Sequence, residues 1–455
     1  MSVERLTDTA IAQFTKRIQG TVIRPGDADF DQARRVWNGM IDRRPALIAR
    51  CASVDDVEAA VEFARVGELL VAVRGGGHSV AGHGTCDDGL VIDLSPMRGV
   101  QADPEARLAR VEGGAIWGSV DRATQIHGLA VTGGIVSETG VAGLTLGGGI
   151  GWLMRKHGLT ADNLRGASLV TADGQLLQAS AEEDAELLWG LQRGGGNFGI
   201  VTELRFRLHP VGPIVLAGWV LYPQEKSTEV LRFYRDYARA APDELTTIVI
   251  LRRLPHLAKL PPFLRGMPVI AIAACYCGVI EDGERAVQPL RAYGAPLVDG
   301  IGLKPYVDHQ TMFDAAQPPG RHNYWKTSYL RELGDAAIDA IVESTRRMTS
   351  PLSLLALYQL GGAARLGDAA FCLNIAATWT DPAESDGHIS WARESWAAIE
   401  PHSSAGAYVN FLGEEGEGQT RSVYRQGYER LVALKNKYDP DNFFRLNQNI
   451  TPTIA

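Results

Sequence analysis

In the first 210 residues, the spacing of hydrophobic and polar residues predicts short helices that alternate with short strands. Ser53 precedes two aspartates and then apolar residues at helical spacing, which predicts an N-capped helix that ends near Gly67. Apolar runs and alternating segments predict short strands between further helices. We expect strands at 69–73, 89–94, 108–112 and 200–208, a helix at 115–127, and a hairpin at 168–179 around Asp173-Gly174.

The pattern changes after the break His209-Pro-Val-Gly-Pro213. Long β-branched and aromatic runs there alternate with amphipathic helices, which predicts an antiparallel sheet with helices on one face. The strands are expected at 216–221, 246–251, 269–278, 353–360 and 371–379, and the helices at 226–240, 281–293, 334–347, 383–398 and 423–437. The predicted fold class is therefore α+β.

Glycine is over-represented and is gathered in the first 200 residues. The chain has 50 glycines in 455 residues, about 11% against a usual ~7%. They gather at 74–82, 113–114, 133–134, 140–151 and 194–199. Backbone N–H groups in such loops bind phosphate oxygens, and glycine lets a ligand approach closely.

Two phosphate-binding motifs are disfavoured. The segment Gly194-Gly-Gly-Asn-Phe-Gly199 matches GxGxxG, but a strand pattern follows it where a dinucleotide-binding fold needs a helix. No Walker GK[ST] sequence follows Arg74-Gly-Gly-Gly-His-Ser79. We therefore expect a different phosphate-bearing cofactor. His78, among glycines, is a covalent anchor, a metal ligand or a turn residue, and a metal is disfavoured because only His83 lies near it.

Charge, cysteine content and hydropathy restrict the partners. Forty-five basic and 53 acidic side chains give a net charge of −8, which disfavours nucleic acid. Five scattered cysteines fit neither a disulfide framework nor paired zinc knuckles. No apolar run reaches the roughly 20 residues of a membrane span, and the first residues show no export pattern. We expect a cytoplasmic protein that neither associates with a membrane nor binds a metal ion.

The glycine motifs, taken in order, resemble those of a known family. They are Arg74-Gly-Gly-Gly-His-Ser79, Gly140-Val-Ala-Gly-Leu-Thr-Leu-Gly-Gly-Gly-Ile-Gly-Trp152, Asp173-Gly174, Gly195-Gly-Asn-Phe-Gly199 and Asp439-Pro-Asp-Asn-Phe-Phe-Arg445. This series resembles the FAD-linked oxidases of the vanillyl-alcohol oxidase type, in their berberine-bridge-enzyme-like branch. The resemblance implies a two-domain, PCMH-type FAD-binding fold. Its FAD domain would comprise 1–210 and the returning segment 411–455, and its substrate domain 211–410.

The resemblance also implies how FAD is held. His78 matches the histidine that bonds covalently to the flavin 8α-methyl group. Many members add a cysteine link, but Val136 stands at that place, so we expect a single tether, with Cys86 a packed thiol. The expected cofactor-binding residues are Arg74, Gly75, Gly76, Gly77, His78, Ser79, His83, Thr139, Gly140, Gly143, Gly147, Gly148, Gly149, Asp162, Ile200, Asn447 and Asn449.

Catalytic and substrate-binding candidates are expected on the sheet and on a strand before the last helix. Tyr408 and Asn410 are two residues apart on a segment interpreted as a strand, which would place both side chains on the same face of that strand. Gln359 completes the catalytic candidates, and Tyr324, Trp325 and Tyr358 would contact substrate. The usual carboxylate base is missing, which leaves Tyr408 as proton acceptor or direct hydride loss from an amine. With no fixed charge recognised, the pocket is expected to suit a neutral, flat or aromatic molecule.

The resulting functional prediction is a flavoprotein oxidase. A small alcohol, sugar or amine would give a hydride to flavin N5, and dioxygen would reoxidise the flavin to yield hydrogen peroxide. Thr139 is not bulky at the position implied to gate oxygen, which favours an oxidase over a dehydrogenase with another acceptor. A non-catalytic flavin- or ligand-binding protein is the other alternative. A nicotinamide-dependent reductase would need a helix after Gly199. Substrate and oligomeric state stay open.

Overall fold

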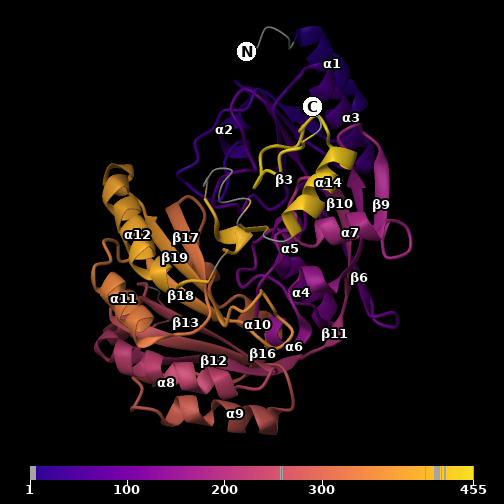
Figure 1. The fold of residues 1–455 in the computed structure, drawn as a ribbon. Coiled ribbons are helices and arrows are strands. Elements are labelled where there is room, and N and C mark those ends of the chain that lie inside the picture. Colours follow the sequence, from indigo (N-terminus) through magenta and orange to yellow (C-terminus); the bar gives the residue numbers. More distant parts are fainter. Residues whose placement is uncertain are drawn as a thin grey trace.

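The computed structural model describes residues 7–256, 258, 260–404, 406–413, 421, 423–424 and 427–453. Figure 1 shows two halves, one formed by the indigo-to-magenta first part of the chain and one by the central part. The yellow C-terminal segment returns to the first half. Two predicted features lie partly outside the described residues. One is the N-terminal segment without an export pattern, and the other is the last helix, at residues 425 and 426.

The first half contains two larger sheets and one short two-stranded sheet. A four-stranded sheet has the order β1-β2-β4-β3, with β3 and β2 parallel to β4. A five-stranded antiparallel sheet has the order β5-β6-β10-β8-β9. The strands are β1 (Thr21–Ile23), β2 (Leu47–Arg50), β3 (Val71–Arg74), β4 (Leu90–Asp93), β5 (Val100–Asp103), β6 (Leu108–Glu112), β8 (Leu164–Val170), β9 (Leu176–Ser180) and β10 (Ile200–Arg207), with β7 (Leu129–Ala130) paired to β11 (His209–Pro210).

Helices flank these sheets. The N-cap of α3 is Ser53, whose hydroxyl accepts a hydrogen bond from Asp56 N–H, as the sequence predicts. The Asp173-Gly174 hairpin joins β8 and β9, also as predicted. Because β10 directly follows Gly199, the GxGxxG motif opens a strand rather than a helix. The helices are α1 (Asp8–Arg17), α2 (Phe30–Ala33), α3 (Val54–Val66), α4 (Trp117–Gln125), α5 (Val141–Leu146), α6 (Met154–His157) and α7 (Ala185–Leu191).

The second half is built on an eight-stranded sheet. Its order is β15-β12-β14-β13-β18-β19-β17, with β16 also paired to β12. All its pairings are antiparallel, as predicted. The strands are β12 (Ile214–Pro223), β13 (Leu245–Arg253), β14 (Pro268–Tyr276), β15 (Val298–Asp299), β16 (Gly302–Pro305), β17 (His322–Leu330), β18 (Leu354–Gln359) and β19 (Phe371–Trp379).

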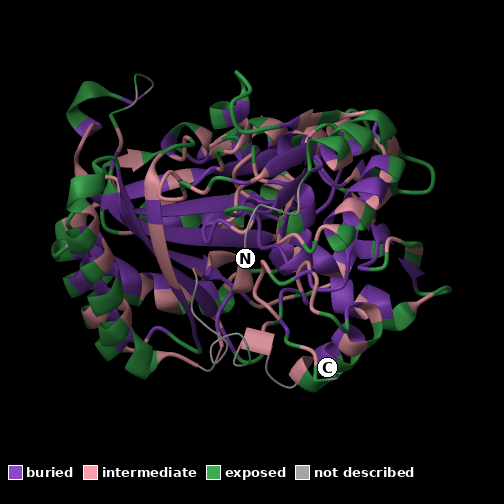
Figure 2. Ribbon diagram, turned by 90° about the horizontal axis from the view of Figure 1, so that it is seen from above, coloured by how far each residue is buried: buried purple, intermediate pink, exposed green. Residues whose placement is uncertain are grey.

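Helices cover one face of this sheet, and the other face looks toward the first half of the chain (Figure 1). On the helix side, Leu355 and Leu357 pack with Trp391. On the opposite side, Ala356 and Tyr358 belong to a separate core. Figure 2 shows the strands buried and the covering helices exposed on their outer side. The helices are α8 (Ser227–Ala240), α9 (Ile280–Ala292), α11 (Asp335–Arg346) and α12 (Ser385–Ile399), with the short α10 (Tyr306–Gln310) elsewhere in this half.

The C-terminal segment completes the first half. Helix α14 (Tyr428–Tyr438) buries Leu431 and Leu434 in the same core as Leu187 and Leu191 of α7. The strand expected before this helix is not formed, because Val409–Phe411 is a turn of 3-10 helix, η8. That expectation was wrong: the segment 406–413 pairs with no strand and instead carries its side chains to a cavity between the halves.

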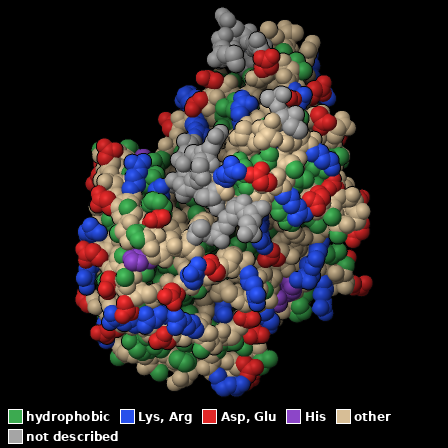
Figure 3. Space-filling view, viewed as in Figure 1, with side chains coloured by type: hydrophobic (Ala, Val, Ile, Leu, Met, Phe, Trp, Pro, Cys, Tyr) green, Lys and Arg blue, Asp and Glu red, His purple; other side chains and the backbone are tan. Residues whose placement is uncertain are grey.

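Charges are mixed on the outer surface. Figure 3 shows Lys and Arg side chains interspersed with Asp and Glu on one face. On α8, Arg232 and Arg235 both pair with Asp335 of α11. Within the described residues, no helix is both long and apolar enough to cross a membrane.

Candidate functional site

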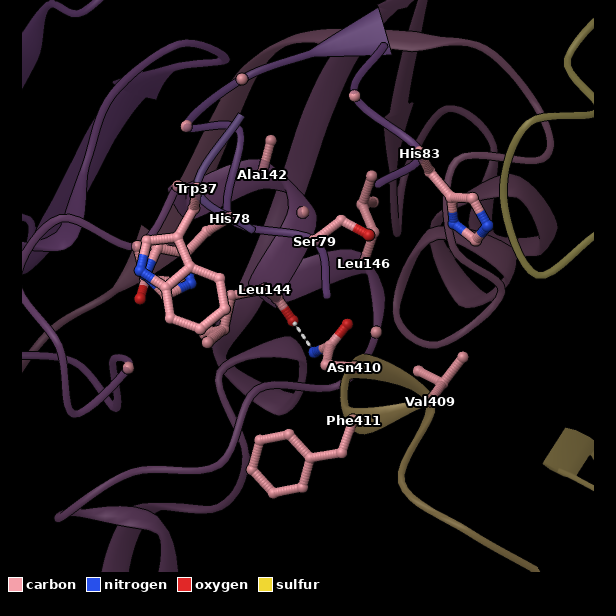
Figure 4. A pocket seen from close by; sticks show the side chains of 18 of the residues that line it. Trp37, His78, Ser79, His83, Ala142, Leu144, Leu146, Val409, Asn410 and Phe411 are labelled. Atoms are coloured by element: carbon pink, nitrogen blue, oxygen red, sulfur yellow. Dashed lines mark hydrogen bonds between the residues drawn. The ribbon is translucent and has the colours of Figure 1, made fainter. Parts of the chain in front are cut away.

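A cavity of about 350 Å³ lies between the glycine loops of the first half and the uncovered face of the eight-stranded sheet. Besides the sheet, the bend after β3, the segment around α5, the start of β10 and the C-terminal return all contribute to its lining. Figure 4 shows side chains from these parts converging on one space. The predicted residues that line it are Arg74, Gly75, Gly76, Gly77, His78, Ser79, His83, Thr139, Gly140, Gly143, Gly147, Ile200, Trp325, Tyr358, Tyr408, Asn410 and Asn447.

The bend after β3 depends on glycine for close packing. A Cβ atom on Gly76 would lie 2.5 Å from the backbone of Gly140, so the two loops meet backbone to backbone. Gly77 has a φ of +66°, which side-chain-bearing residues rarely adopt. The buried Arg74 side chain fixes the bend through an ion pair with Asp93, at 2.8 Å. The glycines of this bend therefore allow the two loops to approach closely at the cavity wall.

His78 stands on this bend with an unused ring nitrogen. Its Nε2 atom is buried and has no hydrogen-bond partner in the described structure. The indole of Trp37 stacks on the imidazole, with ring centroids 4.4 Å apart (Figure 4). Burial lowers the pKa of His78 to about 4, so the ring is neutral at pH 7. A neutral, oriented imidazole with one free nitrogen can react with or bind a ligand in the cavity.

The C-terminal return closes the cavity on another side. The side chain of Asn447 donates to the Gly196 carbonyl at 3.2 Å, while its Oδ1 atom is buried and has no partner among the described residues. Behind it, the buried Lys435 ammonium pairs with Asp439 at 2.6 Å and donates to the Asn197 carbonyl at 3.0 Å. Lys435, which was not among the predicted site residues, thereby links Asn197 of the motif Gly195–Gly199 to the C-terminal motif.

Tyr408 and Asn410 face each other beside the glycine segment 140–151. Asn410 Nδ2 donates to the Tyr408 hydroxyl oxygen at 2.9 Å. It also donates to the Leu144 carbonyl at 3.0 Å (Figure 4). The backbone N–H groups of Gly149 and Ile150 also donate to the Tyr408 oxygen, each at 3.1 Å. Burial nevertheless raises the pKa of Tyr408 to about 12. The phenol therefore keeps its proton at neutral pH, and its O–H has no acceptor among the described residues.

The sheet face under the cavity is a grid of side chains set by strand register. Residues two apart on a strand share a face, and neighbouring strands align them in rows. Three rows cross β13, β18, β19 and β17 in that order: Arg252, Leu354, Ala376 and Trp325; Ile250, Ala356, Asn374 and Thr327; Ile248, Tyr358, Cys372 and Tyr329. The alternation of side chains between the two sheet faces decides which of the predicted residues reach the cavity.

Two candidates fall on the wrong face for this reason. Gln359 follows Tyr358, so it points to the helix side, where its Oε1 accepts from Thr247 and its Nε2 donates to Ala238. Tyr324 precedes Trp325 and likewise packs on the helix side, with its hydroxyl accepting from Arg393 of α12. The prediction of Gln359 as catalytic and of Tyr324 as substrate-binding was therefore wrong.

Four cofactor candidates lie outside the cavity lining. Asp162 accepts from Leu159 N–H and pairs with Arg193 at the surface, so the structure does not bring it to the site. Gly148 and Gly149 have φ of +104° and +78° and form the turn behind the lining. Asn449 has a buried, unpartnered Oδ1 atom but is not part of the lining.

On the sheet face, two polar residues that were not predicted belong to the lining. Arg252 and Asn374 both line the cavity, and the Oδ1 atom of Asn374 is buried without a partner. Strand alternation could have found them, because Arg252 stands two and four residues from Ile250 and Ile248. The expectation of a pocket without fixed charge was wrong, since a guanidinium group belongs to its wall.

This site fits the FAD that the resemblance implies. Backbone N–H groups and close glycine contacts suit a pyrophosphate, and the free Nε2 atom of His78 and Oδ1 atom of Asn447 offer polar contacts. Val136, in place of the second linking cysteine, lines the cavity. All five cysteines are buried and none belongs to the lining, and burial raises the pKa of Cys86 to about 12.

Comparisons with known proteins agree with this geometry. Residues 45–180 match the model of an FAD binding domain, and residues 407–451 match the berberine and berberine-like model. The (R)-6-hydroxynicotine oxidase of Paenarthrobacter nicotinovorans is 32% identical, with 96% of this chain and 97% of that protein covered. An FAD-linked oxidoreductase of Dictyostelium discoideum is 31% identical, with 97% of each chain covered.

Solved structures give the same result. The crystal structure of 6-hydroxy-D-nicotine oxidase from Arthrobacter nicotinovorans superimposes with a TM-score of 0.87 at 30% identity, covering 95% of this chain and 98% of that one. Chitooligosaccharide oxidase shares the fold, with a TM-score of 0.84 at 23% identity over 98% of this chain and 100% of that one. The chain is therefore an enzyme with the predicted PCMH-type FAD-binding fold, and it belongs to the berberine-bridge-enzyme-like family of FAD-linked oxidoreductases.

Proposed function

We propose that this protein is an FAD-dependent oxidase that removes a hydride from a small organic alcohol, sugar or amine. The observation that carries the proposal is the single cavity that joins the glycine bend at His78 to the sheet face carrying Tyr358. Residues 1–210 and 411–455 would form the FAD domain and residues 211–410 the substrate domain. Bound FAD would supply the acceptor for the hydride, and dioxygen would be the final electron acceptor, reduced to hydrogen peroxide.

His78 would be the only covalent attachment point for the cofactor. Its imidazole is neutral at pH 7 because burial lowers its pKa to about 4, so a ring nitrogen is available as nucleophile. Trp37 holds the ring in one orientation by stacking. Val136 has no thiol to form a second link. The remaining cofactor candidates in the lining would hold FAD without bonds to it.

Tyr408 would act mainly as a hydrogen-bond donor toward the bound molecules. Its oxygen already receives three N–H groups, and its own proton is retained up to a pKa of about 12. No Asp or Glu occurs among the described residues that line the cavity. This lining supports direct hydride loss, as from an amine, over abstraction of an alcohol proton by a strong base. Asn410 would position Tyr408.

The choice of oxidase over dehydrogenase rests on Thr139. It lies in the cavity wall next to Gly140, where a larger side chain would narrow the approach of dioxygen. The 32% identical relative is also named an oxidase. A dehydrogenase with another acceptor is the alternative, and a Thr139→Leu variant provides the comparison. Slower reoxidation by dioxygen in this variant, with unchanged reduction by substrate, supports the oxidase.

The decisive experiment is a visible spectrum before and after acid precipitation, followed by a peroxide assay with a panel of amines, alcohols and sugars. We expect a yellow pellet and peroxide release with at least one substrate class. Yellow colour that leaves the wild-type pellet contradicts the tether but keeps FAD. Reduction by substrate without peroxide favours the dehydrogenase, and a flavin that no compound reduces favours the binding protein.

A further inference from the structure

The cavity contains an arginine that the cofactor-binding and hydride-transfer roles above do not use. Arg252 stands near the end of β13, on the face shared with Ile250 and Ile248, and it lines the cavity. Only 8% of the residue is exposed. Its neighbour Arg253 follows it on the strand, points to the opposite side and is exposed. Two adjacent arginines therefore stand in opposite environments.

Arg252 has no anionic partner in the described structure. Its Nε atom donates to the backbone carbonyl of Arg253 at 3.0 Å, which leaves the two terminal nitrogens of the guanidinium group for another acceptor. No carboxylate of the described residues lies within ion-pair distance of it. The neighbouring charge that acts on it is the cation Arg321, which also makes no ion pair there. Burial, together with Arg321, lowers the pKa of Arg252 to about 10, so the group stays charged at pH 7.

A buried, unpaired guanidinium is unfavourable unless something else neutralises it. Two other buried arginines of this chain do have partners. Arg74 pairs with Asp93, and Arg155 contacts Asp243 and three backbone carbonyls. Arg252 lacks such a set and instead belongs to the wall of a cavity. The missing partner is thus expected to come from the ligand.

The sheet register gives the position of this charge. Arg252 and Tyr358 lie on adjacent strands, two rows apart, so their Cα atoms are separated by roughly 14 Å. Tyr358 lies next to Phe411, with ring centroids 5.4 Å apart, and Phe411 lies next to Tyr408, at 4.8 Å. The cationic end of the cavity is therefore distinct from the aromatic end near the glycine segment 140–151.

We propose that Arg252 binds a carboxylate of the substrate, so that the enzyme oxidises an organic acid whose reacting carbon lies toward Tyr358 and Tyr408. This rests on the proposed oxidase function and specifies its substrate class. The two terminal nitrogens of a guanidinium group match the two oxygens of a carboxylate in one plane. The unpartnered Asn374 Oδ1 and Trp325 Nε1 atoms in the same wall provide further polar contacts for the rest of the molecule.

The test compares acids with their uncharged amides. Phenylacetate, trans-cinnamate and 4-phenylbutyrate, each beside its amide, are titrated into the holoenzyme and followed by the flavin absorbance and by calorimetry. We expect at least one acid to bind roughly 10- to 100-fold more tightly than its amide, the range for a hydrogen-bonded charge. Equal binding of acid and amide in all three pairs overturns the proposal.

Variants assign the effect to Arg252. We expect Arg252→Met to abolish the preference for the acid and Arg252→Lys to keep part of it, since lysine retains the charge but not the planar fork. Arg253→Met is the matched control, because it removes the same charge from the other side of the strand. An unchanged acid preference in Arg252→Met, or an equal loss in Arg253→Met, overturns the proposal.

Two further measurements distinguish the carboxylate site from a purely structural role of Arg252 and from a failure of the oxidase proposal. Thermal unfolding of Arg252→Met should show an unchanged or higher melting temperature, because the variant removes an unpaired buried charge; a marked decrease identifies a structural arginine instead. Calorimetry detects acid binding even in protein that proves to contain no FAD. A failure of the oxidase proposal is therefore distinguishable from a failure of the carboxylate site.

Discussion

The indole ring of Trp37 stacks on the imidazole of His78, with ring centroids 4.4 Å apart and planes 22° apart. The indole N–H donates to the backbone carbonyl of Gln317 at 3.1 Å, in the other half of the molecule. Trp37 therefore connects the proposed attachment point to the substrate side. Because the stack restricts the imidazole to one orientation, both residues are expected to affect covalent attachment.

The first prediction concerns this pair. In His78→Ala, we expect acid precipitation to release the flavin colour to the supernatant, whereas the wild type keeps it in the pellet. Trp37→Leu should attach flavin more slowly, because an aromatic pair contributes about 0.5–1.5 kcal/mol beyond its buried area. The measurement is the fraction of the visible flavin absorbance that stays with precipitated protein over time.

His83→Ala is the control for this experiment, since His83 lines the cavity on a different side (Figure 4). It should keep the colour in the pellet. If His83→Ala releases the flavin and His78→Ala does not, the attachment point has been assigned to the wrong histidine.

The second prediction separates two kinds of glycine in the lining. A Cβ on Gly76 meets the backbone of Gly140 at 2.5 Å, so Gly76→Ala should disturb the fold and lower the melting temperature of the apoprotein. A Cβ on Gly143 meets no protein atom within 4 Å and enters the cavity. Gly143→Ala should therefore keep apoprotein stability but lose FAD binding.

Gly387→Ala on the exposed side of α12 serves as the matched control, because its added methyl group also meets nothing within 4 Å but lies far from the lining. Flavin content and melting temperature are measured for all three variants. Normal FAD content in Gly143→Ala would show that the cofactor does not pass beside this part of α5.

How far the sequence alone leads depends on the range of the interactions involved. The N-cap at Ser53 and the Asp173-Gly174 hairpin depend on neighbouring residues, so local patterns predict them correctly. Five strands of the eight-stranded sheet were predicted from their apolar patterns, but β15, β16 and β17 were not, and neither was the strand order. Strand order depends on which long-range pairings bury the most apolar surface, and a single sequence does not report that.

In the candidate site, too, features set by neighbouring residues were predicted and features set by long-range assembly were not. The glycine motifs and His78 were identifiable because they are contiguous in the chain. Tyr358 and Gln359 were both expected at the cavity floor, although neighbours on a strand necessarily face opposite ways. Arg252 was missed because its chemistry comes from the absence of a partner, and that depends on how distant strands are assembled.

The third prediction concerns the Tyr408 hydroxyl. Tyr408→Phe removes the oxygen that receives the N–H groups of Gly149 and Ile150, leaving buried donors unpaired. We expect a loss of about 1–3 kcal/mol in the free energy of unfolding and a lower kcat. Because the pKa of Tyr408 is about 12, the pH profile of kcat in the wild type should show no ionisation of this group below pH 10.

Tyr234→Phe is the control for stability alone. The Tyr234 hydroxyl is also buried and bonds to Thr247, but on the helix side of the sheet. This variant should lose stability and keep its kcat. An ionisation with a pKa near 7 to 9 that is present in the wild type and absent in Tyr408→Phe would identify Tyr408 as a base instead of a donor.

The last prediction uses the buried carboxyl of Asp121 on α4. Its side chain accepts a hydrogen bond from Gln310 at 3.0 Å, yet burial raises the pKa of Asp121 to about 7. The unfolded carboxyl titrates near 3.8. Between pH 4 and pH 7 the folded protein therefore binds a proton that the unfolded chain does not, and the contribution of Asp121 to stability falls as pH rises through this window.

Asp121→Asn should remove this penalty, since the amide is uncharged and its oxygen still accepts from Gln310. We expect the variant to be more stable than the wild type at pH 8, by up to about 4 kcal/mol, with the difference shrinking toward pH 4. Urea unfolding at pH 8, 6 and 4 measures it. Asp335→Asn is the contrast, because its pairs with Arg232 and Arg235 lower the pKa of Asp335, so that removing the charge should destabilise at pH 8. A gain for Asp121→Asn that is the same at all three pH values would mean that improved packing, rather than the buried charge, is responsible.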